Sequence, residues 1–411
     1  DRIIMKKILI LGGAIAQVPL IKSAKDAGLY VVLCDWTTTN PGIVLADKHY
    51  QISTLDLDAV LQVAKEEKVD GVISNSEPAM HNVAVVAEQL GLVGNPPAAV
   101  DALDSKYKFR KLQKDCGLLF PESREVENKE QLCDAIEKIG FPIILKPSEN
   151  SGSRGIEVFF QKDVRELHLA FEKCKNFSRN EKVTVEEYIQ MPSLYNIGGD
   201  IFVYKNQIIW NGMATCIRAK NAKMVPVGEM WPIYESNQHI ELIKESIEKL
   251  IKNSGILHGA YNIEGYFTDK DELFVIEINT RQGGNDIPQL IKDYCGIDMY
   301  KLLVTTAVGI DEYFKQVADN SSTLSQRYIT NYILFSEKDA IYNGIEIDES
   351  LRPMVYKITE NKKIGEKVRC KTDATDAVAM IRLRFDTQAQ QSAFLRNAEQ
   401  LIKLNGSSCM L

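Results

Sequence analysis

Residues 259–284 read GAYNIEGYFTDKDELFVIEINTRQGG. Aromatic and β-branched residues recur on both sides of a polar centre at Lys270-Asp271, which predicts two antiparallel strands joined by a turn. If the turn is symmetric about that dipeptide, Glu264 faces Glu277. The sequence therefore predicts two carboxylates side by side on neighbouring strands.

Two carboxylates placed in this way repel each other, at a cost of up to about 1 kcal/mol. Asn279 lies on the same predicted face, and Arg281 follows two residues later. Oxygen ligands of this kind suit Mg²⁺ or Mn²⁺ rather than zinc. A guanidinium suits phosphate or carboxylate. The stretch therefore predicts a metal site beside an anion site, and the alternative is a surface hairpin with scattered acids.

Composition bounds the class of protein. With 411 residues the chain is expected to form two or three domains, and 45% hydrophobic and 26% charged residues are ordinary for a globular protein. The net charge of −7 argues against nonspecific nucleic-acid binding, so any polyanion would need a local basic pocket or a metal. Eight cysteines without C-x-x-C spacing indicate reduced thiols, and no run of about 18 apolar residues occurs, so we expect a cytoplasmic protein without membrane contact.

The first hundred residues predict a small doubly wound domain. Strands are expected at 7–11, 30–34 and 71–75, with helices at 17–27, 58–67 and 78–91. A dinucleotide site with Asp35 on a ribose is disfavoured, because the loop GGAIAQ lacks two glycines of G-x-G-x-x-G. Glu77 follows a strand at the edge where open sheets bind ligands, although capping of a helix explains it equally well.

Two lysines and a glycine-rich loop follow. The basic helix 104–116 carries Lys106, and a solvated face is the alternative interpretation of Lys106 and of the residues from Lys108 to Lys114. Lys146 stands near the end of the apolar strand 141–147, where an ammonium group needs an anion. Directly behind it, residues 149–155 read ENSGSRG, which predicts a flap over phosphates before the strand 156–160.

The next segment predicts a hinge and a strand-rich half. Strand 183–189 (VTVEEYI) ends at a break, and strands at 200–204 and 207–213 and a helix at 239–253 lead to the hairpin. Arg218 is the first choice for an anchor of a substrate carboxylate, Glu229 for an amino group, and His258 for a place beside an acyl phosphate. For each of these the alternative is a surface charge. Cys216, near Arg218, reads as structural.

Beyond residue 311 the pattern predicts short strands at 327–335, 354–358, 367–371 and 377–385 and a last helix at 387–404. This part reads as a closing or dimer-forming appendage.

Taken in order, these pieces resemble the ATP-grasp superfamily, in the branch of carbamoyl-phosphate synthetase, biotin carboxylase and the L-amino acid ligases. The resemblance rests on two lysines, a glycine-rich loop, V-E-E-Y-I and E-x-N-x-R-x-G-G. It implies α/β and α+β architecture: an N-terminal doubly wound parallel-sheet domain (5–104), an ATP-grasp fold made of a small lid (105–190) and a metal and substrate subdomain (191–310), and a small β-rich C-terminal subdomain (311–411).

The resemblance also implies roles for particular residues. It implies that Lys106 and Lys146, under the flap, bind the phosphates of the nucleotide. It also implies that the hinge binds the adenine through backbone groups and an acidic side chain. Three further residues are implied to bind Mg²⁺, with two ions expected and Mn²⁺ as a possible substitute. Arg281 is implied to support the transferred phosphate. The implied residues are, for the flap, Ser151, Gly152, Ser153 and Gly155; for the hinge, Glu186, Glu187, Tyr188 and Ile189; and for the metal, Glu264, Glu277 and Asn279. The residues expected to contact the substrate are Glu77, Glu229, Gly283 and Gly284.

The sequence departs from the family pattern at two points. Residues 191–196 lack the glutamate that commonly follows the hinge, and Thr280 replaces a more usual proline. These departures leave the identity of the substrate open.

Three classes of function follow. The first is an ATP- and Mg²⁺-dependent ligase that joins a small carboxylate to an amine through an acyl phosphate and is expected to be a homodimer. The second is a carboxylating or formate-using enzyme of purine or biotin-type metabolism. The third is an ATP-binding protein without ligase activity.

Overall fold

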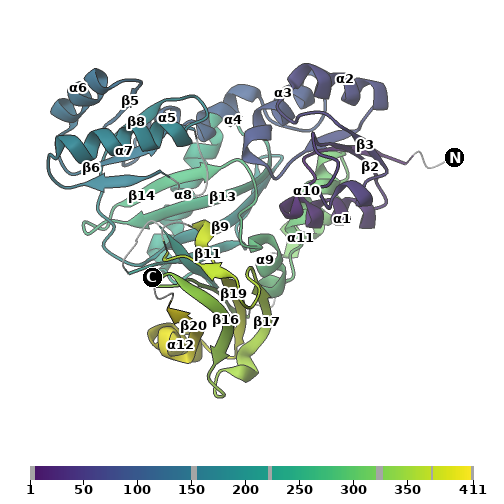
Figure 1. Ribbon diagram of the computed structural model, residues 1–411. Coiled ribbons are helices and arrows are strands. Elements are labelled where there is room, and N and C mark those ends of the chain that lie inside the picture. Colours follow the sequence, from purple (N-terminus) through teal and green to yellow (C-terminus); the bar gives the residue numbers. More distant parts are fainter. Residues whose placement is uncertain (1–4, 150–154, 221–224, 321–326, 372–373, 409–411) are drawn as a thin grey trace.

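The computed structural model describes residues 5–149, 155–220, 225–320, 327–371 and 374–408. They form one parallel sheet and three further sheets with helices packed against them (Figure 1). This mixed architecture confirms the predicted fold class, whereas the division of the chain into four segments stays a prediction.

The N-terminal sheet has the strand order β3-β2-β1-β4, and all of its pairs are parallel. Helices α2 and α3 cover one face, and α1 together with α10, from much later in the chain, covers the other. The elements are β1 (Lys7–Leu11), α1 (Val18–Asp26), β2 (Tyr30–Cys34), β3 (Lys48–Tyr50), α2 (Leu57–Glu67), β4 (Gly71–Ile73), α3 (Met80–Leu90) and α10 (Met299–Ala307), with 3₁₀ turns at Ile15–Gln17, Ile43–Leu45 and Glu77–Ala79.

A second sheet, the lid, has the order β5-β8-β6-β7 with antiparallel pairs. Its apolar side packs against two amphipathic helices and forms a core of its own. Figure 1 shows this unit at the upper left. Its elements are β5 (Ser123–Val126), α6 (Lys129–Ile139), β6 (Ile143–Pro147), β7 (Glu157–Phe159), α7 (Val164–Phe177) and β8 (Val183–Glu187).

The largest sheet carries the predicted hairpin at one edge. Its order is β14-β13-β9-β11-β12-β15-β19-β17, with β10 beside β9. The strands are β9 (Tyr195–Tyr204), β10 (Gln207–Ile209), β11 (Met213–Arg218), β12 (Pro226–Trp231), β13 (His258–Phe267), β14 (Leu273–Asn279), β15 (Tyr328–Leu334), β17 (Val355–Glu360) and β19 (Ala379–Phe385). Three strands from beyond residue 311 therefore continue the sheet that holds the hairpin.

A three-stranded sheet, β18-β16-β20, and helix α12 complete the C-terminal part. Their bounds are β16 (Ala340–Ile347), β18 (Lys367–Val368), α12 (Gln388–Leu401) and β20 (Ile402–Ser408), with 3₁₀ turns at Arg352–Met354 and Ala374–Asp376. The connecting helices are α4 (Pro97–Asp104), α5 (Lys106–Asp115), α8 (Asn237–Ser254), α9 (Ile287–Cys295) and α11 (Glu312–Asn320). None of the helices in the described ranges is long and apolar enough to cross a membrane.

Local chemistry sets the helix ends. Asp56, Ser105 and Ser236 each accept a hydrogen bond from a backbone N–H in the first turn of the following helix, and Gly255 ends α8 in the left-handed conformation. Every residue of α10 except Lys301 is buried, so its sequence lacks the polar face by which a helix is recognised. This explains why it was not predicted.

Candidate active site

Strands β13 and β14 pair as the sequence predicts at the two glutamates and the two asparagines. Glu264 faces Glu277 and Asn262 faces Asn279. Nearer the turn the register shifts by one, with Gly265 opposite Val275. The turn is therefore one residue off the assumed symmetry, and a β-bulge restores the predicted pairing at the glutamates.

Glu277 is surrounded by cations. The Asn279 side-chain amide donates a hydrogen bond to its Oε1 atom at 3.0 Å. Burial alone would raise the pKa of Glu277. The charges of Lys106, Lys146 and Arg281 and the hydrogen bond from the Asn279 side chain outweigh this effect and hold the pKa below its usual value. The carboxylate is therefore ionised and faces positive charge.

Glu264 is paired with Arg218. The Arg218 Nη2 atom donates to Glu264 Oε2 at 2.6 Å, and the Arg218 side chain is 4% exposed. Burial disfavours the guanidinium charge, but neighbouring Cys216 and Glu264 raise the pKa of Arg218 above its usual value. Burial also raises the pKa of the Cys216 thiol to about 12, which fits the structural reading of that residue.

The two glutamates and Asn279 form a donor set that fits Mg²⁺. They supply hard oxygen ligands from one face of one hairpin, close to lysine and arginine side chains suited to phosphates. No group of three or more His, Cys, Asp and Glu residues with metal-binding geometry occurs in the described part of the chain. Such an incomplete protein shell is usual for Mg²⁺ bound together with substrate phosphates.

Arg281 reaches the 3₁₀ turn Glu77–Ala79 that follows β4. Its Nη2 atom lies 3.4 Å from Glu77 Oε2, and its Nη1 atom donates to the Gln282 carbonyl at 2.9 Å. The Glu77 side chain is 8% exposed. The structure thus joins a residue predicted to contact substrate and the arginine predicted to support the transferred phosphate.

The loop after Arg281 is held by a residue that was not predicted. Asp200, which is fully buried, accepts hydrogen bonds from the Gly283 backbone N–H at 3.0 Å and from Asn262 Nδ2 at 2.9 Å. Burial raises the pKa of Asp200 to about 6 despite these bonds. A Cβ atom on Gly283 would lie 2.7 Å from Asn262 Nδ2, whereas Gly284 faces open space.

Lys146 finds its predicted anion inside the protein. Its Nζ atom donates to Glu186 Oε2 at 2.6 Å, and Arg110 Nε donates to Glu186 Oε1 at 3.0 Å. Burial would raise the pKa of Glu186, but the two cations lower it to about 2. This side chain is therefore engaged by Arg110 and Lys146 at the base of the lid.

Arg110 and Gln113 correct the reading of helix α5 as a solvated face. They are 3% and 0% exposed, and Arg110 Nη1 donates to Gln113 Oε1 and to the Ile276 carbonyl, both at 2.8 Å. The buried carboxylate of Glu186 pairs with the Arg110 guanidinium and so offsets part of the cost of burying this charge. The sequence of this polar helix carries no signal for its buried face, which depends on a residue 76 positions away.

The rest of the hinge is more open. Glu187 is exposed, and Tyr188 and Ile189 are half-buried. The Tyr266 hydroxyl donates to the Ile189 carbonyl at 2.6 Å and so ties the hinge to β13. Of the predicted flap, Ser151, Gly152 and Ser153 lie outside the described residues, while Gly155 precedes β7 in the left-handed conformation, with φ of 72°.

Glu229 lies on β12 and is 3% exposed. Asn285 Nδ2 and Asn331 Nδ2 donate to its two oxygens at 3.2 and 3.0 Å. Burial raises the pKa of Glu229 to about 7, against the effect of these amides and of Arg218. It is therefore a buried side chain on the sheet beside Arg218 and not a surface charge.

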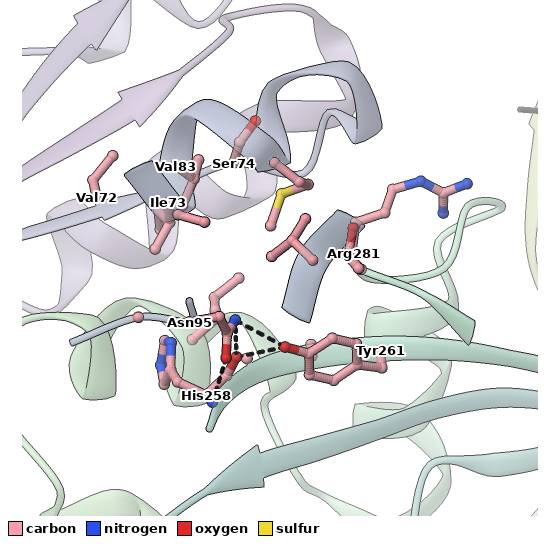
Figure 2. Close-up of a pocket in the computed structure, with 16 residues that line it drawn as sticks. Val72, Ile73, Ser74, Val83, Asn95, His258, Tyr261 and Arg281 are labelled. Carbon is pink, nitrogen blue, oxygen red and sulfur yellow. Dashed lines mark hydrogen bonds between the residues drawn. The ribbon is translucent and has the colours of Figure 1, made fainter. Parts of the chain in front are cut away.

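His258 is not beside the two glutamates. It opens β13, six residues before Glu264, and its Nε2 atom is 2.8 Å from Thr306 Oγ1. Burial lowers the pKa of His258 to about 4. Figure 2 shows it with Asn95 and Tyr261 at a cavity of about 30 Å³, with the Arg281 guanidinium turned away. We therefore leave His258 out of the proposed site, because it belongs to the packing of α10 against the large sheet.

The disfavoured dinucleotide site is also closed. Asp35 accepts hydrogen bonds from Gly13 N at 2.7 Å, Thr37 N at 2.9 Å and Asn40 Nδ2 at 2.7 Å. Gly42 packs on Gly13, to whose carbonyl its N–H donates at 2.8 Å. The loop that would have to admit a pyrophosphate is occupied by the chain itself.

Comparison with known proteins supports the resemblance. Residues 105–311 match the family model described as "Carbamoyl-phosphate synthase L chain, ATP binding domain". The carbamoyl phosphate synthase large chain of Vibrio vulnificus is 26% identical over 256 residues, which is 61% of this chain and 23% of that protein. The chain thus spans about a quarter of the length of that relative.

Solved structures show the same fold. The L-amino acid ligase of Bacillus licheniformis superposes with a TM-score of 0.78 at 19% identity, over 98% of this chain and 99% of that one. The biotin carboxylase domain of the Hydrogenobacter thermophilus 2-oxoglutarate carboxylase, in complex with MgADP, ADP and bicarbonate, superposes with a TM-score of 0.69 at 18% identity, over 98% and 91%.

Proposed function

Because the chain belongs to the family of the carbamoyl-phosphate synthase L chain ATP-binding domain, we propose that it is an ATP- and Mg²⁺-dependent ligase that joins a small carboxylate to an amine. The resemblance to the ATP-grasp superfamily is confirmed by this match and by the fold, and use of ATP and Mg²⁺ is general in that family. The particular activity and its substrates are the proposal.

One observation carries it. Glu264 and Glu277 face each other on neighbouring strands, and Arg218, Lys106, Lys146 and Arg281 supply positive charge around them. Carboxylates with this many cations beside them suit a site that handles a charged phosphate chain. The surface-hairpin alternative does not account for a buried arginine on Glu264.

In the proposed reaction a carboxylate oxygen attacks the γ-phosphorus of ATP and ADP leaves, which gives an acyl phosphate. An amine nitrogen then attacks the acyl carbon, phosphate leaves, and the nitrogen loses a proton to give the amide. Mg²⁺ held by Glu264, Glu277 and Asn279 would supply charge neutralisation at the phosphates.

The chain's own residues supply position and charge. Lys106 and Lys146 are proposed to bind phosphate oxygens, which requires Lys146 to share its ammonium group between Glu186 and ATP. Arg281, fixed by Glu77, and Arg218, fixed by Glu264, are proposed to hold the carboxylate in line with the γ-phosphate. We propose no covalent enzyme nucleophile.

We further propose that Glu264, Glu277 and Asn279 would hold two Mg²⁺ ions, which would neutralise phosphate charge, and that the hinge from Glu187 to Ile189 holds the adenine. A homodimer and a cytoplasmic location stay predictions from the resemblance and from composition.

The experiment is phosphate release from ATP and Mg²⁺ with amino acids singly and in pairs, and with bicarbonate and formate in separate wells. Phosphate release and a condensed product by mass spectrometry with one pair would support the ligase. Release only with bicarbonate or formate would replace it with a carboxylating or formate-using enzyme. ATP binding without release in any well would favour an ATP-binding protein without ligase activity.

A further inference from the structure

A second cavity lies beside Arg218, away from the phosphate-binding residues. Its volume is about 630 Å³, which is in the range of small-molecule sites. It is lined by the ends of β11 and β15, by the start of β16 and by helix α12 and β20. Most of its walls therefore come from the C-terminal part of the chain.

The cavity adjoins the proposed reaction centre. Arg218, one of its lining residues, pairs with Glu264 at 2.6 Å. In the large sheet β11 is followed by β12 and β15, and neighbouring strands are about 5 Å apart, so the cavity extends about 10 Å from Arg218 along the sheet. A ligand with one end at Arg218 reaches the C-terminal elements with the other.

The lining is basic although the protein carries a net charge of −7. Among the described residues that line it, two are acidic, Glu337 and Glu399. Six are basic: Arg218, Lys220, Lys338, Lys371, Arg396 and Lys403. The local excess of positive charge favours an anionic occupant.

Two of these cations have side chains that are largely enclosed by the protein. The side chains of Arg218 and Lys371 are 4% and 9% exposed. Lys371 pairs with Glu337 at 2.9 Å, but Glu337 is itself 68% exposed, so solvent screens the pair. An anion in the cavity would give this largely enclosed ammonium group a further partner.

The walls between the charges are apolar. Tyr332, Leu395 and Ile402 line the same cavity. Such a surface suits a short carbon chain with an anionic end.

We propose that this cavity receives a second anionic group of one substrate, a carboxylate or a phosphate separate from the reacting group. The inference rests on the proposed function and names the class of substrate: a dicarboxylic amino acid or a phosphate monoester that carries the reacting group. The C-terminal part of the chain thereby selects the substrate.

Binding of two probes tests it by titration calorimetry. Glutarate represents the dicarboxylates, glycerol 3-phosphate the phosphate esters, and glutaramide is the uncharged match for glutarate. We expect one of the two anions to bind and glutaramide not to bind. Lys371→Met should weaken that binding at least tenfold, while Lys357→Met, an exposed lysine on β17 outside the cavity, should not change it.

Glutarate binding would identify a dicarboxylic substrate and glycerol 3-phosphate binding a phosphate ester. No binding of either anion, or equal binding to both variants, would overturn the inference. Arg396→Met, at an exposed lining residue, gives the same test if Lys371→Met does not fold.

The proposed function can fail separately. If the proposed function is wrong, no substrate will cause phosphate release. The wild type would still bind the anion and Lys371→Met would still bind it more weakly, so the cavity would remain an anion site. If phosphate release occurs with neutral amino acids and neither anion binds in the titrations, the ligase activity stands and the cavity is not part of the substrate site.

Discussion

Arg281 Nη2 lies 3.4 Å from Glu77 Oε2, although the two residues are 204 positions apart in the chain. The N-terminal part of the chain therefore reaches the proposed reaction centre through a charge pair and fixes one end of the guanidinium. With Glu77 8% exposed and Arg281 19% exposed, the pair is sheltered from solvent.

Glu77→Gln should raise KM for the carboxylate substrate about tenfold and leave KM for ATP unchanged, because it releases Arg281 without touching the lid. Steady-state kinetics of phosphate release measure both constants. Glu88→Gln, an exposed residue of α3, is the control. An equal rise in both KM values would contradict the assignment.

Glu277→Ala should lower ATP turnover about a hundredfold or more, the loss expected when a group that neutralises phosphate charge is removed. The variant should still fold, as its thermal unfolding curve will show, because the substitution removes the repulsion by Glu264 together with the attraction of Lys106, Lys146 and Arg281. The control is Glu272→Ala, exposed on the same hairpin. Retained turnover in Glu277→Ala would remove the metal assignment.

Arg110→Met should lower the free energy of unfolding by about 3 kcal/mol, because Glu186 and Gln113 lose a buried partner. Urea unfolding followed by circular dichroism measures it. The matched substitution Arg165→Met, at an exposed position of α7, should change stability by less than about 0.5 kcal/mol. A similar small effect at both positions would show that the buried charges add nothing.

Gly283→Ala should destabilise the protein by about 1–3 kcal/mol, because a Cβ atom there would lie 2.7 Å from Asn262 Nδ2 and 2.9 Å from Asp200 Oδ1. Gly284→Ala places its methyl group in open space and should leave the unfolding midpoint nearly unchanged. Equal midpoints for the two variants would mean that Asp200 does not fix the loop.

The lowered pKa of His258 predicts that the free energy of unfolding depends on pH. Burial lowers its pKa from the ordinary 6.5 to about 4, so the unfolded chain binds more protons than the folded protein between these values. The stabilisation is present above pH 6.5 and is lost as the pH falls towards 4, by up to about 3 kcal/mol. Urea unfolding at pH 5 and 7.5 should show a smaller difference in His258→Gln than in the wild type.

The hairpin shows how far the sequence leads. Alternation and the polar centre predict its strands, and the pairing of Glu264 with Glu277 is confirmed. The pairing is correct because a bulge near Ile276 offsets the misplaced turn, and a bulge leaves no mark on alternation that a single sequence reveals. The oxygen ligands were therefore easier to predict than the backbone that presents them.

Residues whose environment comes from distant segments were harder to predict. Arg110 and Gln113 lie in a strongly polar helix, and only the partner Glu186, 76 residues from Arg110, shows which face is buried. His258 failed in the opposite way, since its position next to the hairpin motif gave no sign that α10 covers it. Nothing in the sequence around Asp200 indicates that its carboxylate accepts a hydrogen bond from the Gly283 backbone, 83 residues later.

Helix α10 has a consequence for motion. It contacts the N-terminal sheet, the large sheet and α11, and buried side chains from all these parts form one continuous core. The lid sheet, in contrast, has a core of its own. Separating the first two parts would expose that shared core, so we expect relative motion to occur at the lid sheet, while Glu77 stays beside Arg281.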